Sequence, residues 1–424
     1  MKNSTATAFP PFKKAKSVFC LFEDLISKRI LNLKFSGQNI IKLRPELLEN
    51  IFHVYNTRLF SEFMTQPSHG RIKLAKWHES LEDLSQIVKI DPSEIEMGEL
   101  GNSLFISAIC ALVETPILIF SLMDQVNSTT YGQIYFVFIN QNGTWRELCL
   151  DGQLPYRIET VPDEKLLSSN KKASKKDPIK EKEKKTLLFS RLKNKDQNWN
   201  WLGLLEKAYA FAYGSYNKML DCLLEDILYD LTGTSIETLS IKQMSNFELG
   251  DLLLKNFNKG SPMLLLENDL TDRLNELYQR QKTFNQWAMP IIDLRNTNTE
   301  YIIVKIRALK PLKKKKLTYN KGSNNWPTDL KTELGVKFDP ENVVWLSLEE
   351  IKEMFANLII CNINLQNSHK SFPFEFSTFD ALSYAICYFE LHKPFNFGVT
   401  ICQEDFREFE PSVNYRLKII LKSV

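Results

Sequence analysis

The sequence has few histidines, no paired cysteines and no long apolar run. Its apolar segments, such as 103–113 and 263–266, are far shorter than the roughly 20 residues of a membrane-spanning helix. The amino terminus also lacks the apolar core of a secretory signal peptide. We therefore expect a soluble, intracellular protein with no membrane span.

The seven cysteines are scattered without a Cys-x-x-Cys pair, and an odd number over a long chain argues against a disulfide framework. We predict reduced thiols that lie mostly in the core. None of the five histidines lies between His78 and His369. The middle of the chain therefore offers neither a zinc cluster nor a histidine base.

The net charge of +3 is too small to indicate nucleic-acid binding, because acidic and basic residues nearly balance. The basic residues are bunched in the insertion 171–185 and in a run made of Lys313, Lys314, Lys315 and Lys316. Both are most simply solvated loops, and the sharper interpretation is contact with an acidic protein surface. Neither run is interleaved with aromatic residues, which argues against nucleic acid.

Apolar periodicity predicts both helices and strands. Helices are expected over 44–65, 79–88, 103–113, 199–220 with a break at Gly214, and 348–358. Two apolar runs around Asn142-Gly143 indicate a β-hairpin. The chain turns strand-rich from about 247, with strands expected at 262–268, 287–295, 300–309, 342–348 and 359–365, and three more between 368 and 424.

Residues 97–110, MGELGNSLFISAIC, have the build of an enzyme's nucleophile loop, a glycine-containing turn that leads into a buried helix. Asn102 is a natural N-cap, so Ser103 lies at the positive end of the helix dipole. A cysteine there would be activated. An alcohol needs an adjacent general base before it becomes a nucleophile.

This stretch resembles the nucleophile motif of the calpain family, Gln-Gly-x-Leu-Gly-Asp-Cys-Trp, at Gly98, Leu100 and Gly101. Later segments resemble the calpain core in the family's order: NGTWRELCLDGQLPY, WLGLLEKAYAFAYGSY, LYDLTG, LLLKNFNKGSPM and VVWLSLEEIKEMFANLIICNI. The resemblance implies an α+β fold, a papain-like core with a helical and a β-rich subdomain.

The implied domain organisation has four parts: an N-terminal extension (1–60), subdomain 1 (61–212, with a solvated, charged insertion over 163–196), subdomain 2 (213–366) and a partial C2-like β-sandwich (367–424). Three strand-like runs are too few for an independent sandwich. The open sheet edge of this C-terminal segment either receives a strand from a partner or packs back on the core.

The resemblance also assigns the functional positions. Ser103 stands at the nucleophilic cysteine and Met97 at the oxyanion-hole glutamine, while Trp287 and Ala308 stand at the histidine and the asparagine. Lys310 takes a tryptophan position. A base contributes about 10²–10⁴-fold and an oxyanion donor about 10²–10³-fold, so we expect no useful peptidase activity. A Ser–Lys nucleophile is the less favoured interpretation of Ser103.

Two further positions leave alternatives open. Trp287 either plugs the former cleft, which we favour, or stacks on a ligand. The resemblance implies that each half of the core binds a calcium ion through acidic loops. Glu94 matches one acidic ligand position, but the partner acidic position holds Trp199. Because calcium needs several hard oxygen ligands, we expect at most a vestigial calcium site and no other cofactor.

The expected function is therefore that of a catalytically inactive calpain-like protein, a structural or regulatory binding module of an intracellular assembly. The basic loops, the open sheet edge and the reuse of calpain-like modules in such assemblies point to the cytoskeleton or the ciliary axoneme. The alternative is a calcium-dependent cysteine-type endopeptidase with a rearranged active site.

Overall fold

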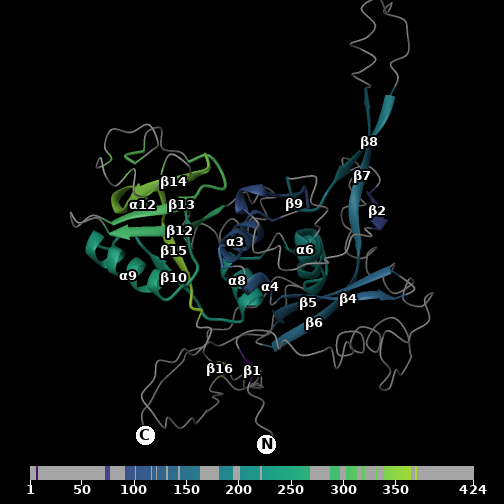
Figure 1. The fold of residues 1–424 in the computed structure, drawn as a ribbon, viewed down its shortest axis with the longest axis horizontal. Helices are drawn as coiled ribbons and strands as arrows, with labels where there is room; N and C mark the ends of the chain where they lie inside the picture. The colour runs from purple at the N-terminus through teal and green to yellow at the C-terminus, as the bar shows by residue number, and fades with distance from the viewer. Residues whose placement is uncertain are drawn as a thin grey trace, which may run out of the picture.

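Figure 1 shows the computed structural model of the chain. The structure describes residues 6–7, 72–76, 91–100, 102–115, 117–120, 122–129, 132–141, 144–162, 181–193, 201–219, 222–267, 287–296, 302–312, 317–319, 326, 331, 334, 336, 339–363 and 368–369. Within these residues the chain forms a helical half, which contains α3 (Ser103–Val113), and a β-rich half beside it (Figure 1).

The helical half is built around α3. Its helices are α3 (Ser103–Val113), α4 (Ile117–Phe120), α6 (Trp201–Ala212), α7 (Tyr216–Met219) and α8 (Leu224–Thr232), preceded by the 3-10 turn η5 (Pro92–Glu94). All eleven residues of α3 are buried, so this helix has no solvent face. It lies in the interior of the molecule.

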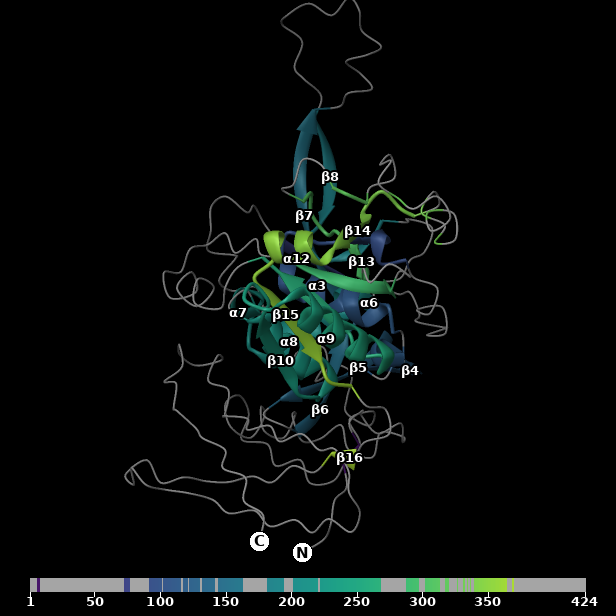
Figure 2. The same cartoon turned by 90° about the vertical axis from the view of Figure 1, so that its left-hand side faces the viewer.

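Short antiparallel sheets flank these helices. They are β4-β5-β6 (Met123–Thr129, Gly132–Gln141, Thr144–Asp151), β2-β7-β8 (Ile72–Lys76, Gln153–Pro162, Glu181–Leu187) and β3-β9 (Ile95–Glu96, Arg191–Leu192). The β7–β8 hairpin projects away from the body in both views (Figures 1 and 2). A further pair joins β1 (Ala6–Thr7) to β16 (Ser368–His369).

The β-rich half is a six-stranded antiparallel sheet in the order β10-β15-β11-β12-β13-β14. Its strands are β10 (Ile236–Ser240), β11 (Met263–Leu266), β12 (Ala288–Asn296), β13 (Ile302–Arg307), β14 (Val343–Ser347) and β15 (Asn357–Cys361). It is accompanied by α9 (Asn246–Asn258) and α12 (Leu348–Met354). Each of these helices starts with a capping box, Ser245 with Glu248 and Ser347 with Glu350.

Two large hydrophobic clusters and a smaller one, around Trp326 and Trp345, lie within the described residues. One large cluster joins α3, α4, α6 and α8 to β5 and to one set of side chains of β11, β12 and β15, and the other joins the six-stranded sheet to α9 and α12. Trp287 and Leu309 pack against both clusters. The two halves therefore share apolar contacts as well as a chain connection.

Several sequence predictions are confirmed. The fold is α+β, Asn102 caps α3, and Gly214, with φ 96°, separates α6 from α7. β5 and β6 pair in register up to Gln141 and Thr144, as expected of a hairpin that turns at Asn142-Gly143. The four predicted strands that became β11 to β14 are also present.

Other predictions are wrong. The predicted helix over 348–358 ends at Met354, because the residues from Asn357 onward pair with β10 and β11. The chain is not uniformly strand-rich from 247, since α9 covers most of 246–258. The solvated insertion over 163–196 is too long, because β8 pairs with β7 and residues 188–190 are buried. Lastly, α8, which follows the predicted boundary at 212, packs on α3 and β5 as well as on β10 and β15.

Other predicted features lie outside the described residues. They are the helices over 44–65 and 79–88, most of the N-terminal extension and of the C2-like segment, and the lysines at 313–316. Among the described helices, none is long and apolar enough to cross a bilayer.

The buried cysteines should resist alkylation. Burial raises the pKa of Cys110 to about 12 and that of Cys361 to about 11, and only a thiolate reacts readily. We expect iodoacetamide at neutral pH to leave both thiols unmodified in the folded protein and to modify both in denaturant, as read by peptide mass spectrometry. Rapid labelling of Cys110 without denaturant would contradict the burial of α3.

Candidate functional site

The candidate site begins at the N-terminus of α3. The Asn102 side chain accepts hydrogen bonds from the N–H groups of Leu104 (2.7 Å) and Phe105 (3.4 Å) and donates one to the Met219 carbonyl (2.7 Å). The cap thus orients α3 and ties it to the end of α7. Ser103 follows directly and is only 2% exposed, so its hydroxyl is shielded from solvent.

The turn before this helix is held by the segment between β8 and β9. The Gly98 N–H donates to Ser190 Oγ (3.1 Å) and the Leu100 N–H to the Leu188 carbonyl (3.0 Å). A Cβ at Gly98 would lie 2.3 Å from Leu188 O and from the Phe189 carbonyl carbon, so only glycine permits this approach. The loop shape is fixed by backbone packing.

The buried carboxylate of Glu206 holds Ser190, which in turn binds the glycine turn at Gly98. Glu206 of α6 is fully buried and accepts hydrogen bonds from the Ser190 hydroxyl (2.6 Å) and N–H (2.9 Å). Desolvation raises the pKa of Glu206 to about 7, although the two Ser190 hydrogen bonds act in the opposite direction. Desolvation raises the pKa of the buried Tyr216, and the nearby Glu206 charge acts in the same direction.

The β-rich half meets α3 at Trp287 and β12. Ser107, one turn after Ser103, donates its hydroxyl to the Ser103 carbonyl (2.8 Å) and accepts the Ala288 N–H (3.1 Å). Trp287 directly precedes Ala288 and packs against both hydrophobic clusters. Met97 packs against the cluster that contains α3. The structure therefore brings three predicted site positions, 97, 103 and 287, to the surroundings of one helix.

The fourth position follows β13. The Ala308 N–H donates to the Asn342 carbonyl (2.7 Å), and its methyl side chain has no polar group. Leu309 packs into both clusters, and the Lys310 ammonium pairs with Glu267 (3.0 Å). Lys310 is therefore engaged within the β-rich half.

The segment predicted to hold a calcium ligand is occupied by the protein's own cations. Glu94 ends η5, and its carbonyl accepts the Lys193 N–H (2.7 Å). The Lys193 ammonium binds the Ser93 carbonyl (2.8 Å), and Asp91 pairs with Arg307 (3.3 Å). These contacts engage the Asp91 carboxylate and the Ser93 and Glu94 carbonyls, so the described oxygens of 91–94 fall short of the six to eight ligands that calcium takes. Within the described ranges no group of three or more His, Cys, Asp or Glu could hold a metal, and Trp199 lies outside them.

A glycine turn leading into a buried helix, faced by an antiparallel sheet, defines a core of the cysteine-protease type. Residues 49–362 match the model of the family described as calpain family cysteine protease. That match covers most of the chain, so the chain belongs to the calpain family.

Individual relatives agree with this assignment. The chain is 24% identical to Calpain-B of Drosophila melanogaster over 64% of its own length and 28% of that protein. It is 29% identical to Calpain-5 of Caenorhabditis elegans over 53% of its length and 32% of that protein, and 29% identical to Calpain-10 of Mus musculus over 36% and 19%. The chain thus spans a third or less of the length of these relatives.

Three residues of the site were not predicted. They are Ser107, Glu206 and Arg307, and each contacts a segment that is distant in the sequence. The shortest of these separations is the 16 residues between Glu206 and Ser190. Glu206 could have been noticed as a charged residue on a helix whose other residues are mostly apolar. For Ser107 and Arg307 the sequence carries no sign of a partner.

The buried Glu206 should make stability depend on pH. Its pKa rises from 4.5 to about 7 on folding, so it stabilises the folded state when protonated, and this stability is lost as the pH rises from about 4.5 to about 7. Glu206→Gln should remove that dependence, which amounts to at most about 3 kcal/mol. Urea unfolding at several pH values measures it.

Glu248 supplies a control of opposite sign. Hydrogen bonds from the Ser245 N–H and hydroxyl lower the pKa of this exposed carboxyl, so its contribution is lost as the pH falls through that lowered value. Glu248→Gln should leave the trend between about pH 4.5 and 7 intact. If Glu206→Gln and Glu248→Gln give the same pH profile, the assignment to Glu206 is incorrect.

Proposed function

We propose that this chain is a calpain-family core that does not cleave peptides and serves as a binding module in an intracellular assembly. One observation carries the proposal: the position of the expected histidine base holds Trp287, which packs against both hydrophobic clusters. An indole cannot accept a proton from a nucleophile, and no histidine occurs between His78 and His369.

The nucleophile position supports the same proposal. Ser103 has an alcohol in place of a thiol, and a helix dipole alone does not activate an alcohol. Its side chain is buried, and the oxyanion position beside it is Met97, which has no hydrogen-bond donor. A positioned base and an oxyanion donor each contribute at least about 100-fold to the rate. We therefore expect their combined loss to lower peptidase activity by about 10⁴-fold.

Relatives named as calpains leave one alternative, a calcium-dependent endopeptidase with a rearranged site. Since the chain spans only part of these relatives, their activities do not transfer to it with the family. The alternative needs a base other than histidine near Ser103. Lys310 is a candidate for that base from the β-rich half, but its ammonium is paired with Glu267.

The first test is proteolysis. Purified protein incubated with casein and calcium should leave the casein intact over many hours, as judged by gel electrophoresis and by fluorescence of labelled casein. An active calpain incubated in parallel shows that the conditions permit cleavage.

Ser103→Ala, prepared in the same way, is the matched control. If the unmodified chain cleaves casein and Ser103→Ala does not, the protein is a peptidase that uses Ser103 and the proposal fails. Equal cleavage by both preparations indicates a contaminating protease, which further purification should remove.

The proposed partner is a protein with an acidic surface, and the proposed location is the cytoskeleton or the ciliary axoneme. The supporting feature is the run of four lysines at 313–316, which lies in the sequence between β13 and β14. Clustered lysines attract acidic chains through long-range charge, and this attraction weakens as salt is added.

Replacement of the lysine run tests this partner. Changing Lys313, Lys314, Lys315 and Lys316 to serine should weaken binding of a fluorescent poly-glutamate peptide about tenfold, as measured by anisotropy at low salt. The control changes the exposed lysines Lys242, Lys255 and Lys259 to serine. Equal losses in the two variants would show that the attraction is general and that 313–316 is no specific site.

A further inference from the structure

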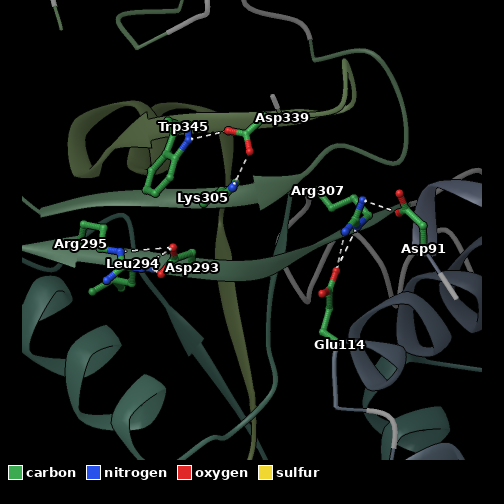
Figure 3. Close-up of polar contacts among 9 residues, drawn as sticks. All are labelled: Asp91, Glu114, Asp293, Leu294, Arg295, Lys305, Arg307, Asp339 and Trp345. Atoms are coloured by element: carbon green, nitrogen blue, oxygen red, sulfur yellow. Dashed lines mark hydrogen bonds and ion pairs between the residues drawn. The ribbon is translucent and has the colours of Figure 1, made fainter. Parts of the chain in front are cut away.

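Arg307 joins the two halves through charge. It ends β13 in the six-stranded sheet, and its side chain is 7% exposed. Its guanidinium donates to Glu114, which caps the C-terminus of α3, from Nε (3.1 Å) and from Nη2 (2.7 Å). Nη1 donates to Asp91 (3.3 Å), the N-cap of η5 (Figure 3). One side chain of the β-rich half therefore holds two segments of the helical half.

The partners of Arg307 lie at both ends of the candidate site. Asp91 precedes the glycine turn, and Glu114 follows the last turn of α3. Because the Asp91 carboxylate also accepts the Ser93 N–H (2.8 Å), Arg307 fixes the start of η5 as well as the far end of the helix. Such a contact resists any displacement of one half relative to the other.

A second cation acts on the same segment from within the helical half. The Lys193 ammonium binds the Ser93 carbonyl (2.8 Å) while its N–H binds the Glu94 carbonyl (2.7 Å). Arg191 pairs with Glu96 just beyond (3.0 Å). Side chains of the chain itself thus bind the Asp91 and Glu96 carboxylates and the Ser93 carbonyl of segment 91–96.

We propose that Arg307 and Lys193 act as built-in cations that hold segment 91–96, and with it the glycine turn and α3, in one position without calcium. A calcium ion would have to displace the guanidinium from Asp91 and the ammonium from Ser93 before it gained the oxygens it requires. The two halves are then fixed by internal charge. This holds whether or not Ser103 cleaves peptides, so the casein experiment and the tests below can fail separately.

Arg307→Met tests the contact between the halves in the full chain. The substitution keeps the aliphatic stem and leaves two carboxylates without their cation, so we expect Tm to fall by about 5 °C in calcium and in chelator alike. Arg295→Met is the matched control, since Arg295 pairs with Asp293 within β12 and is 55% exposed (Figure 3). That variant should change Tm by no more than about 1 °C.

Hydrogen exchange gives the local readout. In Arg307→Met the amides of 91–96 and of Glu114 should exchange at least about tenfold faster, while those of β10 stay unchanged. If Arg307→Met does not fold, Glu114→Met removes the Glu114 part of the contact from the other side and should give the same local increase at residue 114. Equal Tm and exchange in Arg307→Met and Arg295→Met would overturn the proposed contact.

Calcium itself is the remaining probe. In the unmodified protein, exchange of amides 91–101 should be the same with millimolar calcium and with chelator. A slowing by calcium that Glu94→Gln abolishes would show that the segment binds the ion, and the proposal of built-in cations would then be wrong. Lys193→Met should speed exchange at 93–94 in both conditions.

Discussion

The complete burial of α3 is the constraint on which the rest of the structure depends. A helix without a solvent face must satisfy its terminal polar groups inside the protein. Asn102 does so at the first turn, and the Thr115 N–H donates to the Leu112 carbonyl at the last, next to the ion pair of Arg307 with Glu114. Between them, the Ser107 hydroxyl accepts an N–H from the neighbouring β12. Both halves are therefore arranged around this one helix, and each supplies part of its polar environment.

Packing and chemistry are separable at this site. The backbone of the glycine turn is supported by Leu188, Ser190 and the buried Glu206, and none of these contacts requires a thiol at position 103. In the same way, Trp287 fills space between the two cores, where the family resemblance implies a histidine. The calpain fold can thus be stable in a chain whose expected catalytic positions hold other residues.

Local patterns predicted the elements well, and long-range contacts poorly. Strands β11 to β14 and the cap at Asn102 follow from nearby apolar periodicity and one polar residue. The missed helix α9 had a usable signal, because Ser245 and Glu248 have the spacing of a capping box. Arg307 had none, since its partners Glu114 and Asp91 lie 193 and 216 residues away in the chain. The family resemblance located positions 97, 103, 287 and 308, but only the folded structure shows what surrounds them.

Gly98 has a consequence for how such chains are recognised. The residue is required because the backbone at Leu188 and Phe189 leaves no room for a side chain, a reason that is independent of hydrolysis. Mutational drift can therefore erase the reacting atoms while the glycine spacing stays in place. A motif search that rewards those glycines detects ancestry and architecture, and a chain can score well on it with no enzymatic turnover at all.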